Sequence, residues 1–587
     1  MGRVAHSADM HLTFLGGANT VTGSRYLLTT ERASVLIDCG MFQGSPNESI
    51  RNRIPLGFDP KTLDAILVTH AHLDHCGLLP VAVREGYTGP IYLTSATAEL
   101  ATLVLMDSGR LHEEFAKRAT RFETRHPDRA AVEDRQQLAD YQAALEMARL
   151  AGAAPGVGDG TAEAKALAAK LPEAREGADD EEAMVASAAR PPGPTLHQAA
   201  AATGEHVPTT IEAEPPFSGP DPEAELRSQP PELIVDLDAP LYTAADAANV
   251  PPLFRNVRYD RELEVAPGVS ATFLDAGHIL GSAMIRLRVR EGDMERTFVF
   301  SGDLGRPGTP ILRDPTVLTD ADYVLCESTY GGREHEPEDE ATRILTETVH
   351  MVSDAGGVLL IPSFAIGRTQ EIVWELDRMI ERGEIPLLPL YLDSPMASKA
   401  SDVYRRHPEF YDEETANILQ AGGSPLDYPK QTITHDVKES RAIAQAPRPY
   451  MIVASNGMLT GGRVVGHLRN LIGDPGATLL FVGYQGQGTL GAHLQAGAKQ
   501  VKIDGLLREV KCRVQSISGF SAHADESELL DWIANFGRGR QLGAPGFPRL
   551  VFLVHGDPEA QIALAPKVEG LGFKVRIPHW RETVALD

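Results

Sequence analysis

The run of six residues from His70 to His75 constrains this chain more than any other feature. It holds three imidazoles and a carboxylate, and it directly follows residues 63–69, whose apolar pattern is typical of a buried strand. Imidazole nitrogens and carboxylate oxygens are ligands that zinc accepts. Packing gives no reason to crowd four such groups onto one tight loop between a strand and a helix. The run therefore predicts a metal site at the end of a strand in an α/β fold.

Four more residues of this chemical kind stand directly after an apolar, strand-like stretch. Each alone could cap a helix or close a turn. Strand ends in α/β layers are where open sites form, so together with the first run they supply enough ligands for two metal ions. Asp303 is the natural carboxylate to bridge two cations, and Asp38, at another predicted strand end, could orient a ligating imidazole. The four residues are His278, Asp303, Glu327 and His555.

Composition and charge limit what the chain can bind. At 587 residues it is long enough for several domains, and its 42% hydrophobic and 23% charged residues are ordinary globular values. The formal net charge is −26, and residues 121–240 hold 23 Asp and Glu against 10 Lys and Arg, which is half of the excess. Any nucleic-acid site must therefore be local rather than a broad basic face.

Membrane and export signals are missing from the sequence. It contains no run of about 18 apolar residues, and residues 1–9 lack the apolar core of a signal peptide. Whether these residues, ahead of Met10, are translated is left open. The four cysteines show no CxxC spacing. We therefore expect no membrane contact and a reducing, cytoplasmic location.

The pattern of residues changes along the chain. Residues 153–232 are rich in Ala, Pro and acidic residues, cannot bury enough apolar surface to offset chain entropy, and are expected to be weakly ordered. This stretch is either a binding insert or a tolerated surface loop, and its composition favours the loop. The last segment, from about 505, again has short apolar runs typical of strands, like those of residues 10–120, and a strand is expected at 512–517. A separate α/β pattern lies between, with strands at 357–361, 389–392, 450–454 and 478–482 and a helix at 367–382.

The motifs and their order resemble a known family. The run at His70, the GHILGS sequence around His278 and the SGDLG sequence around Asp303 are similar to the metallo-β-lactamase superfamily. Further motifs resemble its β-CASP branch. Within that branch they are most similar to the RNA-processing ribonucleases of bacteria and archaea that are homologues of the cleavage and polyadenylation endonuclease. These motifs are ESTYG from Glu327, PSFAIGR from Pro362, FSAH from Phe520 and LVHG from Leu553.

The resemblance implies an α/β fold with a particular domain order. A four-layer αββα metallo-β-lactamase core would be split in the sequence, with an α/β β-CASP domain inserted in it. The first part of the core would cover residues 10–325 and contain an acidic low-complexity insert at about 121–238. The β-CASP domain would cover 326–504, and the second part of the core, an RNA-metabolising segment, would cover 505–587.

The resemblance also implies two Zn²⁺ per chain and a role for each residue of the site. His523 would be the general acid that protonates the leaving oxygen, and Glu327 would hold and tune its imidazole. The attacking group would be a hydroxide activated by both metals, with Asp74 able to accept its proton. One zinc would be held by His70, His72, His278 and Asp303, and the other by Asp74, His75, Asp303 and His555.

The implied substrate is single-stranded RNA. His555 favours RNA, because the DNA-repair branch of the family has valine at this motif position. Ser363 and Arg368 are candidates for RNA phosphate contacts, although Arg368 could instead pair with Glu371 at the start of a helix. Two tyrosines could stack on bases or pack at the domain seam, namely Tyr330 and Tyr484.

Three other functions stay open on the sequence alone. They are a DNA nuclease of the same fold, a non-nucleolytic ester hydrolase of the metallo-β-lactamase fold, and a non-catalytic scaffold. The β-CASP motifs argue against the ester hydrolase, and the presence of every expected ligand argues against the scaffold. Exonuclease and endonuclease modes, and a monomer or a homodimer, are all compatible with the sequence.

Overall fold

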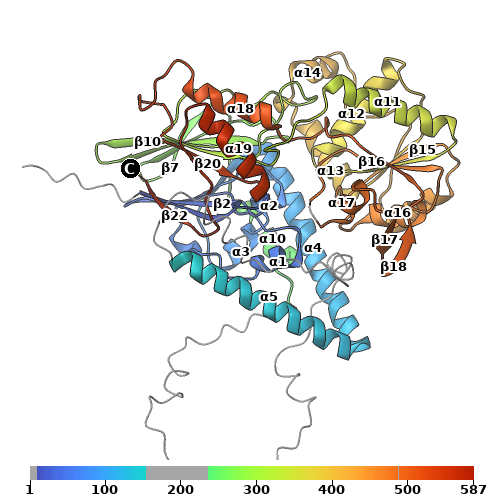
Figure 1. The fold of residues 1–587 in the computed structure, drawn as a ribbon, viewed down its shortest axis with the longest axis horizontal. Coiled ribbons are helices and arrows are strands. Elements are labelled where there is room, and N and C mark those ends of the chain that lie inside the picture. Colours follow the sequence, from blue (N-terminus) through green and yellow to red (C-terminus); the bar gives the residue numbers. More distant parts are fainter. Residues whose placement is uncertain (1–9, 154–235, 487, 587) are drawn as a thin grey trace, which may run out of the picture.

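The computed structural model describes residues 10–153, 236–486 and 488–586. The stretch predicted to be weakly ordered, 153–232, lies outside these ranges except for its first residue. Two units lie side by side, a core of two stacked sheets and a second α/β unit at its flank (Figure 1). Within the described ranges, no helix is long and apolar enough to cross a bilayer.

The first sheet of the core has seven strands in the order β22-β1-β2-β3-β4-β5-β6. Several of its strands, such as β1, β3 and β4, are short apolar runs whose side chains are mostly buried. β22, from the end of the chain, pairs antiparallel with β1, so the last segment completes the sheet that the first segment begins. The strands are β1 (Met10–Gly16), β2 (Arg25–Thr29), β3 (Ser34–Ile37), β4 (Ala65–Leu67), β5 (Ile91–Thr94), β6 (Phe254–Val257) and β22 (Thr583–Leu586).

The second sheet also has seven strands, in the order β21-β20-β11-β10-β9-β8-β7. Its neighbours β20, β11 and β10 run parallel to one another, so their carboxyl ends meet at one edge. Residues that follow these strands are therefore brought close together. The strands are β7 (Glu262–Ala266), β8 (Val269–Asp275), β9 (Ala283–Glu291), β10 (Met294–Phe300), β11 (Tyr323–Glu327), β20 (Leu550–Val554) and β21 (Val575–Arg576).

The two sheets pack face to face with helices on both outer faces. Large apolar side chains from both sheets, such as Phe14, Phe273 and Phe552, fill the space between them. Helices cover the outer face of each sheet (Figure 1). This arrangement confirms the predicted four-layer αββα core. The helices are α18 (Glu526–Ala534) and α19 (Pro558–Gly570) on the second sheet, and α3 (Leu79–Arg84), α4 (Ser95–Arg125) and α10 (Ala244–Ala248) on the first.

The start of the predicted acidic insert is helical. α4 continues to Arg125, and α5 (Pro127–Ala153) follows at once. One side of α5 packs against Phe42 and Trp580 of the core, through Tyr141 and Ala144. Up to residue 153, this polar region therefore consists of two helices that pack on the core. Two shorter helices complete this part of the core, α1 (Pro46–Ser49) and α2 (Leu73–Cys76).

The second unit is a six-stranded parallel sheet in the order β14-β13-β15-β12-β16-β19, with helices on both faces (Figure 1). The inner strands β12, β15 and β16 are buried on both sides, which is why they are continuous apolar runs, whereas the edge strands β14 and β19 are polar and partly exposed. The strands of this sheet are β12 (Val358–Pro362), β13 (Leu390–Asp393), β14 (Gln431–Ile433), β15 (Tyr450–Ala454), β16 (Ala477–Phe481) and β19 (Arg513–Ser516). The helices are α11 (Glu338–Asp354), α12 (Arg368–Glu381), α13 (Pro395–Arg406), α14 (Glu413–Gln420), α15 (Val437–Ala442), α16 (Arg463–Leu471) and α17 (Leu490–Gln495), and a hairpin is formed by β17 (Gln500–Ile503) and β18 (Leu506–Glu509).

The last strand of this sheet corrects the boundary expected at residue 504. The sequence pattern predicts that the strand at 512–517 belongs to the core, but β19 pairs in parallel with β16 of the middle sheet, from Arg513 opposite Thr478 to Ser516 opposite Phe481. The apolar pattern of a strand identifies the strand and not its partner. The chain therefore leaves the middle sheet only after Ser516.

Candidate metal centre

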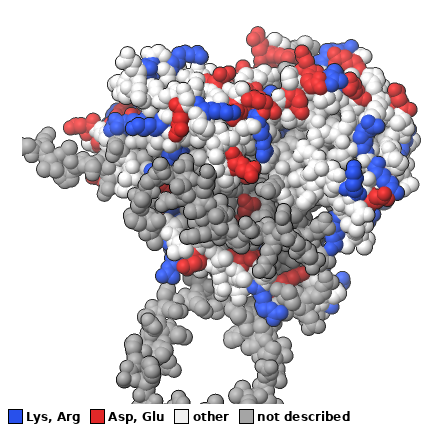
Figure 2. All heavy atoms as spheres, viewed as in Figure 1, with Lys and Arg blue, Asp and Glu red and all other residues white. Residues whose placement is uncertain are grey.

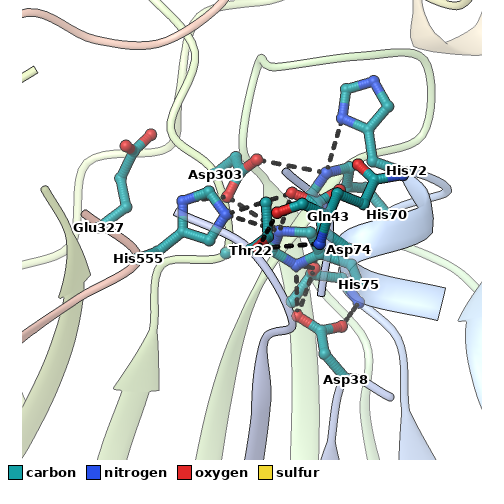
Figure 3. A network of polar contacts seen from close by, with 12 residues as sticks. Thr22, Asp38, Gln43, His70, His72, Asp74, His75, Asp303, Glu327 and His555 are labelled. Carbon is teal, nitrogen blue, oxygen red and sulfur yellow. Dashed lines mark hydrogen bonds and ion pairs between the residues drawn. The ribbon is translucent and has the colours of Figure 1, made fainter. Parts of the chain in front are cut away.

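The structure brings the seven predicted metal ligands together at one end of the stacked sheets. Figure 3 labels all of them except His278. Four come from the loop and short helix that follow β4. The other three follow β8, β10 and β20 of the facing sheet. The residues form two groups whose ligand atoms lie within 4.8 Å of one another, His70, His72, His278 and Asp303 in one and Asp74, His75 and His555 in the other.

The first group has the spacing of ligands around a single ion. His72 Nδ1 lies 3.1 Å from His70 Nε2 and 3.3 Å from His278 Nε2. Asp303 Oδ2 lies 3.4 Å from His70 Nε2 and 3.5 Å from His278 Nε2. Two ligands about 2.0–2.1 Å from a tetrahedral zinc are about 3.3 Å apart. The four ligand atoms therefore fit one zinc ion.

The second group meets the first at Asp303. His75 Nε2 lies 3.3 Å from His555 Nε2 and 3.2 Å from Asp303 Oδ1, and Asp74 Oδ2 lies 3.5 Å from His555 Nε2. The two carboxylate oxygens of Asp303 thus face different groups, Oδ2 the first and Oδ1 the second. This is the arrangement that a carboxylate bridging two cations requires.

The electrostatics of the cluster suit cations. Burial lowers the pKa of His70 to about 3 and that of His278 well below its ordinary value, so both imidazoles are neutral, as metal ligands must be.

Burial of Asp303 opposes its ionisation, but coulombic attraction to His555 and His75 outweighs it and holds the pKa of Asp303 well below the usual range. Asp303 is therefore a buried anion at the point where the two groups meet. Burial also opposes protonation of His75, but the carboxylates of Asp303 and Asp38 outweigh it and raise the pKa of His75 well above its ordinary value, so metal binding must displace this proton.

Residues behind the cluster orient the ligands. The predicted partner Asp38 accepts from Thr69 N–H at 2.8 Å, and its Oδ2 lies 2.7 Å from His75 Nδ1. His278 Nδ1 lies 3.1 Å from the carbonyl oxygen of Ala522. Sequence reasoning missed Thr69, although it directly precedes His70. It also missed Ala522, for which a backbone carbonyl leaves no signal in the side-chain pattern.

The predicted general acid His523 lies beside the cluster. Its Nδ1 is 3.0 Å from Glu327 Oε1, and its Nε2 is 4.0 Å from Asp303 Oδ2. Glu327 is fully buried and also accepts from the N–H of Leu304 at 2.8 Å. Burial lowers the pKa of His523, but the Glu327 carboxylate outweighs it and raises the value to about 9. The imidazole therefore carries a proton near neutral pH and presents Nε2 toward the metal centre.

Two predicted RNA contacts lie outside the cluster and have partners inside the protein. Ser363 is fully buried, and its hydroxyl accepts from Thr369 Oγ1 at 3.1 Å. Arg368 is 6% exposed and forms an ion pair with Glu371 at the start of α12, as the alternative interpretation expects. Phosphate contacts by Ser363 and Arg368 stay predictions.

The two predicted base-stacking tyrosines lie at the seam between the two units. Tyr330 is buried and packs against the rings of His335 and Tyr484. Tyr484 donates a hydrogen bond of 2.9 Å from its hydroxyl to Asp557. These contacts agree with seam packing, and stacking on bases stays a prediction.

The sequence matches three family descriptions in chain order. "Metallo-beta-lactamase superfamily" matches residues 19–159, "Beta-Casp domain" matches 369–494, and "Zn-dependent metallo-hydrolase RNA specificity domain" matches 508–578. The match to the RNA specificity domain therefore includes β19, which belongs to the middle sheet.

Known proteins are similar to the chain over nearly its whole length. "Ribonuclease TTHA0252" of Thermus thermophilus is 32% identical over 575 residues, covering 98% of this chain and 100% of that protein. "Transcription termination factor FttA" of Methanosarcina mazei is 28% identical, covering 98% of this chain and 72% of that protein. The same factor from Methanocaldococcus jannaschii is 27% identical, covering 96% and 69%. With its fold and its His/Asp metal site, the chain belongs to the metallo-β-lactamase/β-CASP ribonuclease family.

Proposed function

We propose that this protein is a zinc-dependent ribonuclease that hydrolyses phosphodiester bonds of single-stranded RNA with two Zn²⁺ per chain. The observation that carries the proposal is Asp303, whose two oxygens face two separate ligand groups while the imidazole of His523 stands 4.0 Å away. Bound zinc ions lower the pKa of water and neutralise the charge that builds on the phosphate.

The residues of the chain supply the proton transfers. Water attacks phosphorus, a new P–O bond forms, and Asp74 accepts the water proton. Hydrogen bonding to His555 outweighs burial and holds the pKa of Asp74 well below its usual range, so Asp74 is a carboxylate. As the bond to the leaving oxygen breaks, His523 donates its proton to that oxygen, and Glu327 keeps the imidazole aimed.

RNA is the favoured polymer for three reasons. His555 stands at the motif position that distinguishes the RNA branch, a relative with full coverage is named a ribonuclease, and the last family match describes RNA specificity. On the face drawn in Figure 2, the coloured Lys and Arg side chains are interspersed with Asp and Glu rather than gathered in one surface. We therefore propose that RNA is held locally, along the seam beside the metal centre.

We also propose a cytoplasmic location, because the four cysteines are free thiols.

The test uses the purified chain with 5′-labelled single-stranded RNA and DNA of the same sequence. We expect the wild type to degrade RNA and to leave DNA essentially intact. Asp74→Ala and His523→Ala should each lose about 10²-fold or more in RNA cleavage. A control, His435→Ala in the middle unit, should cut like the wild type. Cleavage by both variants at the wild-type rate would refute the mechanism, and equal cleavage of DNA would refute the RNA assignment.

A further inference from the structure

His523 lies on an irregular loop, residues 517–525, that joins β19 to α18. β19 belongs to the middle sheet, whereas α18 covers the second sheet of the core. The loop therefore crosses from one unit to the other and must still hold an imidazole within hydrogen-bonding distance of Glu327. Two distant segments, 304–306 and 333–336, supply the bonds that fix it.

Glu336 makes three of these hydrogen bonds through one carboxylate oxygen. Its Oε2 accepts hydrogen bonds from the backbone N–H groups of Ser518 and Gly519, both at 2.8 Å, and from the Ser518 hydroxyl. Hydrogen bonds to a carboxylate are shorter and stronger than those between neutral groups. One carboxylate oxygen thus fixes the first turn of the loop that carries His523.

Close packing at Gly519 reinforces this attachment. A Cβ atom at this position would lie 2.6 Å from the Cβ of Ala341 and 3.0 Å from the carbonyl oxygen of Glu336. Only glycine fits between the loop and the start of α11. The loop is therefore pressed directly onto the segment that carries Glu336.

The same segment also holds the far end of the loop. His335 Nε2 lies 3.1 Å from the carbonyl oxygen of His523, and the His335 N–H donates to Asp525 Oδ2 at 3.2 Å. The N–H of Glu526 donates to the carbonyl oxygen of Arg333 at 3.0 Å. Segment 333–336 therefore runs along the loop and bonds to it at both ends.

Segment 304–306 connects the loop to the metal centre. Leu304 directly follows Asp303, its N–H donates to Glu327 and its carbonyl oxygen accepts from Ala524 N–H, both at 2.8 Å. Arg306 donates to the carbonyl oxygen of Gly519. The loop and Glu327, the partner of the imidazole, thus both bond to the residue that directly follows Asp303.

We propose that Glu336 is a positioning residue that acts through His523, by fixing loop 517–525 so that the imidazole Nε2 faces the scissile phosphate. The inference rests on the proposed function, in which His523 protonates the leaving oxygen as its bond to phosphorus breaks. Glu336 is not part of either ligand group. Its removal should therefore slow the step that needs the acid. Ala522 of the same loop orients His278, so zinc content is measured on the variant to separate loss of the acid from loss of metal.

The test compares Glu336→Ala with the wild type on two substrates that differ in their leaving groups. The leaving oxygen of RNA needs a proton, whereas the p-nitrophenolate of bis(p-nitrophenyl) phosphate departs without one. General acid catalysis contributes about 10²–10⁴-fold, so we expect kcat on RNA to fall by about 10–100-fold. The aryl ester should change by less than about 2-fold, with zinc content and KM for RNA unchanged. Equal losses on both substrates would overturn the proposal.

A double variant gives an independent test on RNA alone. If Glu336 acts through His523, Glu336→Ala combined with His523→Ala should cut RNA as slowly as His523→Ala and no more slowly. Multiplied losses in the double variant would overturn the proposal. The matched control is Glu340→Ala, which removes a half-exposed carboxylate of α11 that pairs with Arg343 and should stay within about 2-fold of the wild type. A wild type that fails to cut RNA would refute the proposed function itself, which separates the two failures.

Discussion

Two buried aspartates at strand ends, Asp303 in the core and Asp393 in the middle sheet, have opposite surroundings. Asp393 is fully buried and accepts hydrogen bonds from Ser440 Oγ at 2.5 Å and Arg463 Nη1 at 2.7 Å, and its Oδ2 lies 2.5 Å from His467 Nε2. Asp303 is 2% exposed, yet its Oδ1 has no hydrogen bond. Its two oxygens face imidazole nitrogens at 3.2–3.5 Å.

The difference separates a structural carboxylate from one that needs a cation. A buried charge is costly unless paired groups compensate it, and at Asp393 protein groups do so. At Asp303 the neighbours are ligand-type nitrogens at the spacing of a coordination sphere, so we propose that bound metal ions complete the compensation. The variants below test this contrast, from the largest expected effect to the smallest.

Asp303→Asn should have the largest effect. The amide keeps the size of the side chain but removes the charge shared by both ligand groups, so zinc binding and RNA cleavage should both collapse. We expect cleavage to fall by about 10³-fold or more while the fold is retained. Zinc analysis, circular dichroism and RNA cleavage measure the three quantities. A variant that keeps wild-type zinc and activity would show that Asp303 is not the shared ligand.

Glu327→Gln should weaken proton donation by His523, the general acid. The pKa of His523 is raised to about 9, so the imidazole is protonated below that pH and activity should decline as the pH rises through it. Without the Glu327 charge this pKa falls, so the alkaline decline should move to lower pH, with kcat about 10–100-fold lower at pH 8. The pH dependence of kcat measures this. An alkaline limb that stays in place would contradict the assignment.

Asp393→Asn should change stability rather than chemistry. It breaks a buried charge network, which costs about 3–5 kcal/mol, while zinc content and kcat stay near the wild type. Hydrogen bonds from groups such as His467 outweigh burial and hold the pKa of Asp393 well below its usual range. The stability it contributes is therefore present above the ordinary Asp pKa and lost as the pH falls through the lower, folded-state value. Urea unfolding of the wild type and the variant at pH 7 measures the first effect, and a difference between them that narrows as the pH falls below the ordinary Asp pKa measures the second. Loss of zinc would contradict the contrast with Asp303.

Ser363→Ala should have the smallest effect. Its hydroxyl is buried and bonded to Thr369, so we expect less than about 1 kcal/mol of destabilisation and a KM for RNA within about 2-fold of the wild type. Thr369→Val serves as the control for the same internal bond. A KM raised tenfold in Ser363→Ala alone would instead support the phosphate contact predicted from the sequence.

Much of the site could be located from sequence because its residues follow strands. His278, Asp303 and His555 each come directly after a buried apolar run, and β10, β11 and β20 are parallel neighbours whose carboxyl ends meet at one edge. Pattern alone thus placed side chains from distant segments at one end of the sheets. The αββα core followed from the family resemblance and is confirmed by the strand order.

Other features depended on contacts that a side-chain pattern does not encode. Ala522 orients His278 through a backbone carbonyl, which every residue possesses. The strand Arg513–Ser516 was expected, but its partner was not, because pairing is decided by where the chain runs in space. Composition predicts an insert from about residue 121, whereas Tyr141 and Ala144 pack helix α5 of this stretch onto the core.

The most direct test of the account is the number of zinc ions bound per chain in the wild type. Elemental analysis of protein purified without chelator, and a zinc titration of metal-free protein, should both give about two ions per chain, as two ligand groups that share one carboxylate require. RNA cleavage should disappear with the ions and return as both sites fill. A stoichiometry of one or none in protein that still cleaves RNA would contradict the account.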